Sequence, residues 1–387
     1  MTAEAITGSA SAAPSAASYV AEGLGSVGIP GGAAKAPPGR VPAPAGAADA
    51  SGAVVVRDLR RLPKAHLHLH LEGSMRPATL ADLARRHGVP VPDMDAFGSF
   101  REFGLRYDEA VSLVRCEDDL RRVVREVVED AATDGALWLE PAVNPVRYGQ
   151  AFGRSSAYVL DFLIDEACGA AARAGIGCGL LVTALRHLDP REAVDLARLA
   201  ATRADAGVAG FGLAADESLH PPEPFADAFA LARAAGLITA PHAGELAGPA
   251  SVRGALDALG AQRVQHGVRA IEDAGLVARL ADEGVALDVC PTSNFRLGIV
   301  DSVTAHPLPR LLDAGVRCTL AADDSLLFGS GLLDEYESAR TVLGLSDNSL
   351  AEVARSSLEA SGAPEGTVRA GVAGVAAWLK GQGAANW

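Results

Sequence analysis

A regular alternation of short, β-rich apolar runs with longer amphipathic stretches is the feature that most constrains the fold. The alternation begins near Leu59. The apolar runs cover residues 65–71, 136–143, 177–185, 208–213, 237–243, 263–266, 285–290 and 317–322. Stretches between them, such as 117–132, 191–204, 225–235 and 251–259, carry one apolar stripe each, as surface helices do. Eight strands that alternate with helices predict an α/β fold, a (β/α)8 TIM barrel with a parallel sheet.

The first part of the chain has a different character. Residues 1–57 are dominated by Ala, Gly, Pro and Ser and hold few large apolar side chains, so we expect a disordered tail there. Residues 58–387 are then one barrel domain, a length that such a barrel commonly has. The tail contains a glycine pattern over 23–28 that formally matches a dinucleotide-binding fingerprint. No strand precedes that pattern, so we attach no function to it.

Charge and cysteine content limit the partners and the compartment. The formal net charge is −14, from 48 acidic and 34 basic residues, which argues against nucleic acid or an anionic membrane as the main partner. No apolar run is long enough to span a bilayer, and no secretory signal is recognisable. The five cysteines form no Cys-x-x-Cys pair, which favours a reducing compartment. We expect a cytoplasmic protein that acts on a small molecule; the sequence leaves its oligomeric state open.

Residues capable of chemistry recur where the predicted strands end. In a (β/α)8 barrel the active site lies at the carboxyl-terminal rim of the strands. The candidates at these ends are His68, His70, Glu140, Asp216, Glu217, His242, Glu245, His266, Thr292, Ser293, Asn294, Asp323 and Asp324. Their repeated placement at one end of successive strands predicts a shared site at the rim.

A metal site is the first chemistry that this set allows. His66, His68 and His70 alternate with leucine, so they share one face of a strand. Together, His68, His70, His242 and Asp323 offer three nitrogens and one carboxylate, the ligand types that zinc takes in catalytic sites. The chain has neither the His-Glu-x-x-His pattern nor the Pro-Cys-x-x-Cys pattern of other zinc hydrolases and base deaminases.

Four ordered motifs resemble the adenosine deaminase family between about Leu62 and Tyr336. They are Leu67-His68-Leu69-His70-Leu71-Glu72-Gly73, His242-Ala243-Gly244-Glu245, His266-Gly267 followed by Glu272-Asp273, and Asp323-Asp324. Cys290-Pro291-Thr292-Ser293-Asn294 adds weaker support. The resemblance implies a (β/α)8 barrel, one zinc ion per subunit and the hydrolytic deamination of a purine.

The resemblance also implies a role for each motif residue. It assigns zinc to His68, His70, His242 and Asp323. It makes His266 the residue that orients the attacking water and takes its proton, and Glu245 the acid that protonates ring nitrogen N1. That role requires Glu245 to hold a proton, so we expect burial to raise its pKa.

Substrate contacts follow from the same resemblance. Asp324 would meet ring nitrogen N7, and a backbone N–H of Ala215 or its neighbour would meet N3. His70 would line the substrate as well as the metal. Glu72 stands where many family members have an aspartate that contacts the ribose.

A segment over 94–107 would form a helical lid inserted after the first strand, because Phe97, Phe100 and Phe103 suit a cover over the purine. A plain core-facing helix is the alternative.

Three positions depart from the family pattern. His66 replaces a frequent glutamate, and we expect it to be a buried, hydrogen-bonded residue outside the metal site. Ala215 replaces a glycine, and the segment after Glu140 lacks an expected arginine. We assign no chemistry to the remaining histidines, which are His87, His187, His220 and His306.

The expected substrate is adenosine or 2′-deoxyadenosine, in purine salvage. The first alternative is another adenine derivative: free adenine, an aminofutalosine-type nucleoside or a modified nucleotide. A phosphate would need arginines, for which Arg147, Arg269 and Arg296 are candidates. A catalytically inactive relative that binds a ligand or a partner is a further alternative. An amidohydrolase with a carbamylated lysine between two metals is disfavoured, because no lysine falls in a predicted strand.

Overall fold

The computed structural model describes residues 57–95 and 97–381. Its strands are β1 (Lys64–His70), β2 (Ala136–Val143), β3 (Gly177–Cys178), β4 (Leu180–Leu185), β5 (Val208–Ala214), β6 (Ile238–Ala243), β7 (Arg263–His266), β8 (Ala286–Val289) and β9 (Arg317–Leu320). They pair in parallel in the order β1-β2-β4-β5-β6-β7-β8-β9, and β3 also pairs with β2. Every predicted run contains a strand, and the run 177–185 is divided into two at Gly179.

The sheet closes on itself between its first and last strands. Leu69 forms a parallel bridge with Asp323, three residues beyond β9. The N–H of His70 donates to the Asp323 carbonyl at 2.9 Å, and the N–H of Asp323 donates to the His68 carbonyl at 3.1 Å. The predicted (β/α)8 barrel is therefore confirmed. Its closing contact joins the first sequence motif, which contains His68 and His70, to the last, which contains Asp323.

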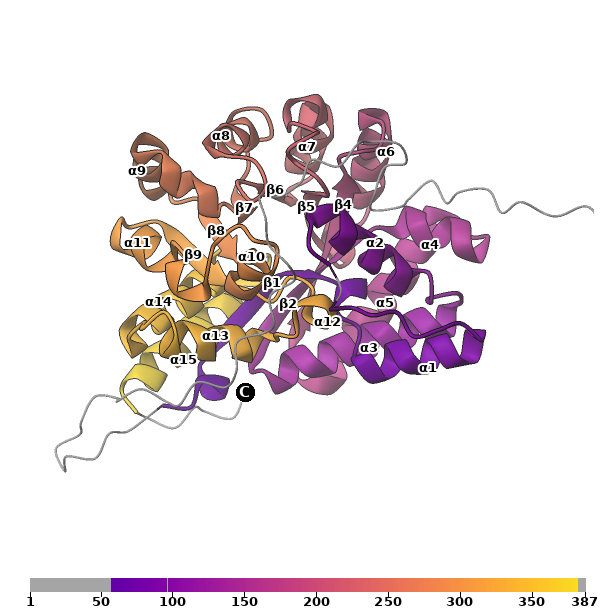
Figure 1. Cartoon of the computed structure of the whole chain (residues 1–387), viewed down its shortest axis with the longest axis horizontal. Coiled ribbons are helices and arrows are strands. Elements are labelled where there is room, and N and C mark those ends of the chain that lie inside the picture. The colour runs from indigo at the N-terminus through magenta and orange to yellow at the C-terminus, as the bar shows by residue number, and fades with distance from the viewer. Residues whose placement is uncertain (1–56, 96, 382–387) are drawn as a thin grey trace, which may run out of the picture.

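Helices surround the strands (Figure 1). They are α1 (Pro77–His87), α2 (Phe100–Val111), α3 (Glu117–Thr133), α4 (Pro145–Phe152), α5 (Ser156–Ala174), α6 (Pro190–Ala201), α7 (Ala226–Ala234), α8 (Pro249–Asp257), α9 (Ala274–Glu283), α10 (Pro291–Arg296), α11 (Leu308–Asp313), α12 (Ser325–Phe328), α13 (Leu332–Thr341), α14 (Asp347–Glu359) and α15 (Glu365–Leu379). In the described residues no helix combines the length and apolarity needed to cross a membrane. The predicted tail over 1–57 lies outside the described residues except for Arg57.

A helical insertion separates β1 from β2, as expected. It comprises a short 3-10 turn (Glu72–Ser74) and helices α1, α2 and α3. The predicted aromatic residues pack together: the Phe103 ring stacks on Phe328 of α12 with 5.3 Å between centroids, and Phe97 meets both rings edge-on. Because α12 directly follows Asp324, these contacts fasten α2 near the barrel rim. Whether α2 acts as a lid stays a prediction.

Polar residues also occupy the interior at the opposite end of the barrel. Arg263, at the start of β7, pairs with Glu140 at 2.7 Å and with Asp288 at 2.6 Å, and all three side chains are almost fully buried. The expectation that Glu140 belongs to the rim is therefore wrong, because its carboxylate is turned toward the beginning of β7.

A second correction concerns lysine. Lys64 begins β1, so one lysine does lie in a barrel strand, one residue ahead of the predicted run. Its Nζ donates to the carbonyls of Leu59 and Leu62 at the amino-terminal end of the strand. Burial lowers the pKa of Lys64 to about 7. Its position at the end of β1 opposite to the rim still excludes it as a bridging ligand in the site described below.

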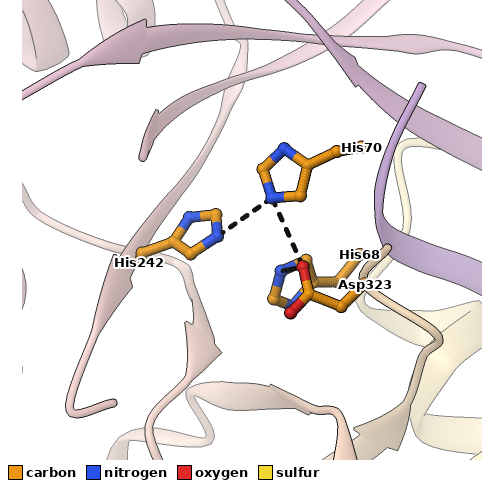
Figure 2. Close-up of side chains that lie close together, drawn as sticks. All are labelled: His68, His70, His242 and Asp323. Carbon is orange, nitrogen blue, oxygen red and sulfur yellow. Dashed lines mark hydrogen bonds and ion pairs between the residues drawn. The ribbon is translucent and has the colours of Figure 1, made fainter. Parts of the chain in front are cut away.

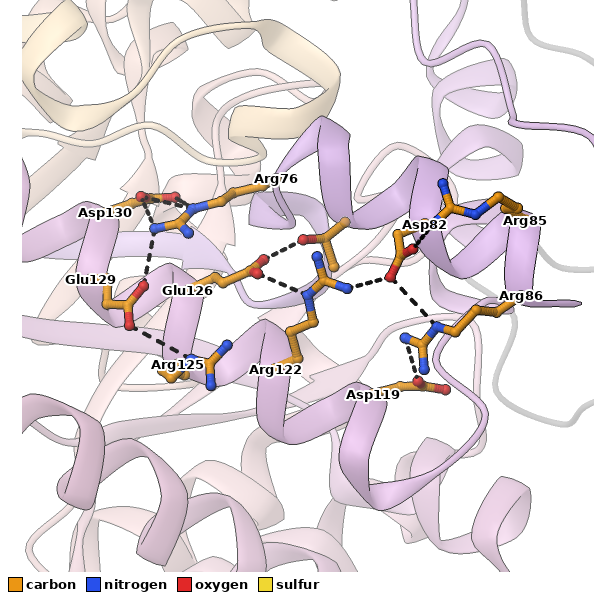
Figure 3. Close-up of polar contacts among 11 residues, drawn as sticks. Arg76, Asp82, Arg85, Arg86, Asp119, Arg122, Arg125, Glu126, Glu129 and Asp130 are labelled. Atoms are coloured by element: carbon orange, nitrogen blue, oxygen red, sulfur yellow. Dashed lines mark hydrogen bonds and ion pairs between the residues drawn. The ribbon is translucent and has the colours of Figure 1, made fainter.

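Helices α1 and α3 are joined on the outside of the barrel by a chain of ion pairs (Figure 3). Arg122 of α3 pairs with Asp82 of α1 at 2.6 Å and with Glu126 at 2.9 Å. Arg76 pairs with Asp130 at 2.6 Å. Alternating charges three or four residues apart on facing helices produce this ladder.

Candidate active site and metal centre

Four buried side chains meet at the carboxyl-terminal rim. His68 and His70 come from β1, His242 from β6, and Asp323 from the segment after β9 (Figure 2). Their ligand atoms all lie within 4.8 Å of one another. The two Nε2 atoms of His70 and His242 are 3.3 Å apart, and Asp323 Oδ1 is 3.4 Å from the Nε2 atoms of both His68 and His70. The structure thus brings together the four residues predicted to bind metal.

Backbone carbonyls set the orientation of two of these rings. His68 Nδ1 lies 3.2 Å from the Asp288 carbonyl oxygen, and His242 Nδ1 lies 3.0 Å from that of Leu213. A carbonyl only accepts, so each Nδ1 carries the hydrogen and each Nε2 presents a lone pair to the centre. A metal-binding histidine commonly donates the hydrogen of its other ring nitrogen to a carbonyl in this way, which fixes its tautomer.

Two histidines of the cluster have lowered pKa values. Burial lowers the pKa of His70 to about 4, and burial together with the neighbouring His68 and His70 holds the pKa of His242 well below its usual value. Neutral imidazoles and a carboxylate around one point form the donor set that Zn²⁺ prefers. On this observation the residues fit one metal ion.

Backbone strain is concentrated at this rim. Ala215, His266 and Asp323 are the non-glycine residues with positive φ in the described part of the chain, at 78°, 62° and 59°. L-residues rarely adopt this conformation, which persists where surrounding contacts demand it and which clusters at functional sites. At the positive φ of Ala215 a glycine would be free of this strain.

Glu245 lies beside the cluster on the loop that follows β6. Its side chain is 4% exposed, and Oε1 is 3.5 Å from His266 Nε2 and has no hydrogen-bond partner within the described residues. Burial, followed by the charges of Asp323 and Glu217, raises the pKa of Glu245 well above its usual value. The pKa shift of Glu245 has the expected direction, which favours a protonated carboxyl, and Oε1 lies unpartnered beside the cluster.

Glu217 holds the Glu245 loop in place, a role that the sequence did not reveal. Its carboxylate accepts the backbone N–H groups of Gly244, Glu245 and Ala247 at 2.9, 2.6 and 2.9 Å, and the hydroxyl of Ser251 at 2.5 Å. Four donors on one buried carboxylate fix the loop firmly, because each bond to a charged acceptor is strong. The acidic pair at the end of β5 was the available signal, since Glu217 follows Asp216 there.

A relay of hydrogen bonds sets the tautomer of His266. The N–H of Leu308 donates to His306 Nδ1 at 3.1 Å, so His306 donates from Nε2 to Asn294 Oδ1, also at 3.1 Å. The Asn294 amide then donates to His266 Nδ1 at 3.3 Å. His266 consequently carries its hydrogen on Nε2, directed toward Glu245 and Asp323.

This relay corrects one expectation and explains another. His306 was given no chemistry, but it is the buried link between the main chain and His266. The Cys290–Asn294 segment, whose support was weak, contributes both Asn294 and Ser293, and the Ser293 hydroxyl donates to Asp323 Oδ2 at 2.7 Å. The segment therefore positions a predicted metal ligand and a predicted proton-transfer residue.

Asp324 presents a second protonated carboxyl to the site. It is 1% exposed, its Oδ1 has no hydrogen-bond partner among the described residues, and burial and the adjacent Asp323 raise its pKa well above the usual value. Gly73 makes room for it, because a Cβ on Gly73 would lie 1.6 Å from Asp324 Oδ1. A neutral Asp324 can donate a hydrogen bond.

The remaining predicted residues lie at the edge of this site or away from it. Glu72 is buried next to His70, whereas His66 lies outside the cluster and accepts the N–H of Ala322 at 3.1 Å, as expected of a buried structural histidine. The arginines considered for a phosphate do not converge. Arg147, Arg269 and Arg296 pair separately with Asp108, Glu272 and Asp95.

The fold and the site together define a barrel hydrolase with a buried cluster suited to one metal ion. The family model for adenosine deaminase matches residues 63–378, and the chain belongs to this family. It is 46% identical over 337 residues to a protein of Streptomyces virginiae described as a putative adenosine/adenine deaminase, a match that covers 84% of this chain and 99% of the relative. Its activity is accordingly that of a deaminase, an aminohydrolase.

Two solved structures show the same architecture. The adenine deaminase of Arthrobacter aurescens superimposes with a TM-score of 0.75 at 31% identity, over 82% of this chain and 99% of that one. An amidohydrolase of Burkholderia ambifaria with bound zinc gives a TM-score of 0.75 at 30% identity, over 84% of this chain and 91% of that one.

Proposed function

We propose that this protein is a zinc-dependent deaminase that hydrolyses free adenine to hypoxanthine and ammonia. The observation that carries the proposal is the pair of buried carboxyls, Glu245 and Asp324, which flank the four-residue cluster with unpartnered oxygens and whose pKa values are raised by burial. A purine offers a ring nitrogen acceptor to each of them, N1 to Glu245 and N7 to Asp324.

One zinc would be held by His68, His70, His242 and Asp323, and it would supply a water whose pKa is lowered to about 7. Zinc is supported by the three-nitrogen, one-carboxylate donor set and by the zinc in the related amidohydrolase.

Protein groups account for the rest of the reaction. Glu245 protonates N1, which draws electrons from C6 and opens it to attack by water. The Nε2–H of His266 donates to the attacking oxygen and orients it. Proton acceptance at that nitrogen would first require the other tautomer, so the relay favours the orienting role over the basic one. The water gives up two protons in all: one returns to Glu245, and the other joins the amino group, which then leaves C6 as ammonia.

Free adenine is favoured over the adenosine expected from the motifs. Two relatives named above are described as acting on adenine, one of them as adenosine/adenine. In addition, the cavity that Glu72 helps to line measures about 20 Å³, which is room for about one water.

Ultraviolet turnover of adenine, adenosine, 2′-deoxyadenosine and AMP by the purified protein tests the proposal. Adenine should give the highest kcat/KM. Preference for a nucleoside or for AMP would restore the adenosine-type or nucleotide alternative, and no turnover of any of the four would reject adenine-ring deamination.

A further inference from the structure

Glu72 is held between two tyrosines. It lies in the short turn directly after β1, and its side chain is 3% exposed. The hydroxyl of Tyr107, from α2, donates to Glu72 Oε2 at 2.9 Å. The hydroxyl of Tyr148, from α4, donates to Oε1 at 2.5 Å. Each carboxylate oxygen therefore already has a donor before any substrate arrives.

The tyrosines are themselves fixed by neighbouring side chains. The Arg147 guanidinium lies over the Tyr107 ring, 5.6 Å from its centroid, and also pairs with Asp108. Tyr107 meets the His70 ring edge-on at 6.1 Å, and Tyr148 packs on Phe152 at 5.6 Å. Burial and the Glu72 charge raise the pKa of both tyrosines well above the usual value, so their hydroxyls remain donors. We call this arrangement of Tyr107, Glu72 and Tyr148 the tyrosine clamp.

The clamp lies where the far end of a bound purine would point. Glu245, His266 and Asp323 approach from the β6 to β9 side of the rim. The small cavity under the clamp is lined from the β1 to β5 side, by residues that include His70, Glu72, Tyr107, Asn144 and Leu185. In a purine, N9 is on the opposite side of the ring system from C6. With C6 at the metal cluster, a substituent on N9 therefore extends toward the clamp.

We propose that the tyrosine clamp is the specificity device of this enzyme, which excludes purines that carry a sugar on N9 and admits the free base. The inference rests on the proposed function, because it explains which adenine-bearing molecule can enter. A sugar needs the space that the clamp fills. Its hydroxyls would also have to displace a tyrosine from Glu72, since both carboxylate oxygens are already bonded. Discrimination is strong when a buried polar group would lose its partner.

Tyr148→Phe, Tyr107→Phe and the double variant test the clamp, since each keeps the ring and removes one donor from Glu72. The measured quantity is the ratio of kcat/KM for adenosine to kcat/KM for adenine. The ratio should rise about tenfold or more in a single variant and further in the double variant, as expected for loss of a hydrogen bond to a charged group. Tyr158→Phe is the matched control, because it removes an exposed tyrosine–glutamate bond to Glu117 and should leave the ratio unchanged.

A substrate series on the unmodified protein provides a second measurement that needs no variant. A methyl group is close in size to one water, so 9-methyladenine should be turned over at least tenfold better than adenosine. If the protein rejects 9-methyladenine as strongly as adenosine, any substituent on N9 is excluded regardless of its size, and the clamp is not the cause. An unchanged ratio in folded Tyr148→Phe and Tyr107→Phe proteins would lead to the same conclusion. In both cases the proposed function would still hold if the unmodified protein deaminates adenine. If the unmodified protein does not deaminate adenine, the proposed function itself is wrong.

Discussion

Two charged regions of this molecule differ in how their groups are paired. On the outside, the ladder between α1 and α3 gives each arginine a carboxylate partner, as with Arg122 and Asp82. At the rim, Asp323, Asp324 and Glu245 are crowded together and none of them pairs with an arginine or lysine within residues 57–95 and 97–381. Each charge of the surface ladder is balanced by an opposite charge beside it, whereas buried carboxyls that lie close together shift one another's pKa. That difference marks the rim as the place where chemistry occurs.

A third region, the ion-pair network of Arg263 inside the barrel, shows that a buried charged group need not be a functional one. Arg263, Glu140 and Asp288 are as buried as the rim carboxyls, but both of these carboxyls contact the Arg263 guanidinium, and Glu140 also accepts the Trp138 and Gly362 N–H groups. Burial alone therefore does not identify a reactive group. What distinguishes the rim is burial combined with carboxyl oxygens that have neither a hydrogen-bond donor nor an arginine or lysine beside them.

Replacing the rim acid should produce the largest effect. In Glu245→Gln the side chain keeps its size but cannot protonate N1, so kcat should fall by about 10²–10⁴-fold, the range for loss of a general acid. Steady-state turnover of adenine measures this. Glu272→Gln, an exposed glutamate paired with Arg269, is the control and should retain activity. Full activity of Glu245→Gln would contradict the mechanism.

Breaking the buried network should cost stability, and breaking the surface ladder should not. Arg263→Met leaves Glu140 and Asp288 buried without their cation, so we expect a loss of about 3–5 kcal/mol in the free energy of unfolding. Arg125→Met removes an exposed ion pair with Glu129 and should cost less than about 1 kcal/mol. Urea unfolding of both variants measures the difference. Equal losses would mean that burial does not separate these two networks.

The pH dependence of kcat/KM reports on the crowding of rim carboxyls. Glu245 must be protonated to act, and its pKa is raised by burial and by the charges of Asp323 and Glu217. Activity should therefore be retained below the raised pKa and lost as pH rises through it. Glu217→Gln removes one of the raising charges, so the alkaline limb should move to lower pH. If the alkaline limb stays at the same pH in Glu217→Gln, the Glu217 charge does not influence the protonation of Glu245, and Glu217 only holds the loop.

The smallest effect is expected at a strained backbone position. Ala215→Gly relieves an unfavourable φ of 78° but adds freedom to the unfolded chain, and the two terms nearly cancel. The free energy of unfolding should change by less than about 1 kcal/mol. A loss well above that value, in the same urea measurement, would show that the Ala215 methyl makes packing contacts that matter.

Much of this organisation was predictable because it is local in the chain. Alternation of apolar runs and amphipathic stretches locates the strands, and a residue at a strand's end must lie at the rim. His68, His70, His242 and Asp323 could thus be chosen together from three separate strand ends. The same argument failed for Glu140, because its position along β2 did not reveal its partner on β7.

What the sequence did not show depends on contacts between distant segments. The relay from Leu308 through His306 and Asn294 to His266 has no spacing that a periodic pattern could reveal. Tyr107 and Tyr148 reach Glu72 from two different helices, 35 and 76 residues along the chain. These partners decide a tautomer and, by our inference, a substrate, so the finer aspects of function required the three-dimensional arrangement.

The central claim is that the four-residue cluster holds one zinc on which adenine deamination depends. Titration of zinc into chelator-treated protein, with adenine turnover followed at each step, tests it most directly. The account predicts that turnover is absent without metal and rises to a plateau at one zinc per chain. Turnover that persists without metal, or that needs two zinc ions per chain, would contradict it.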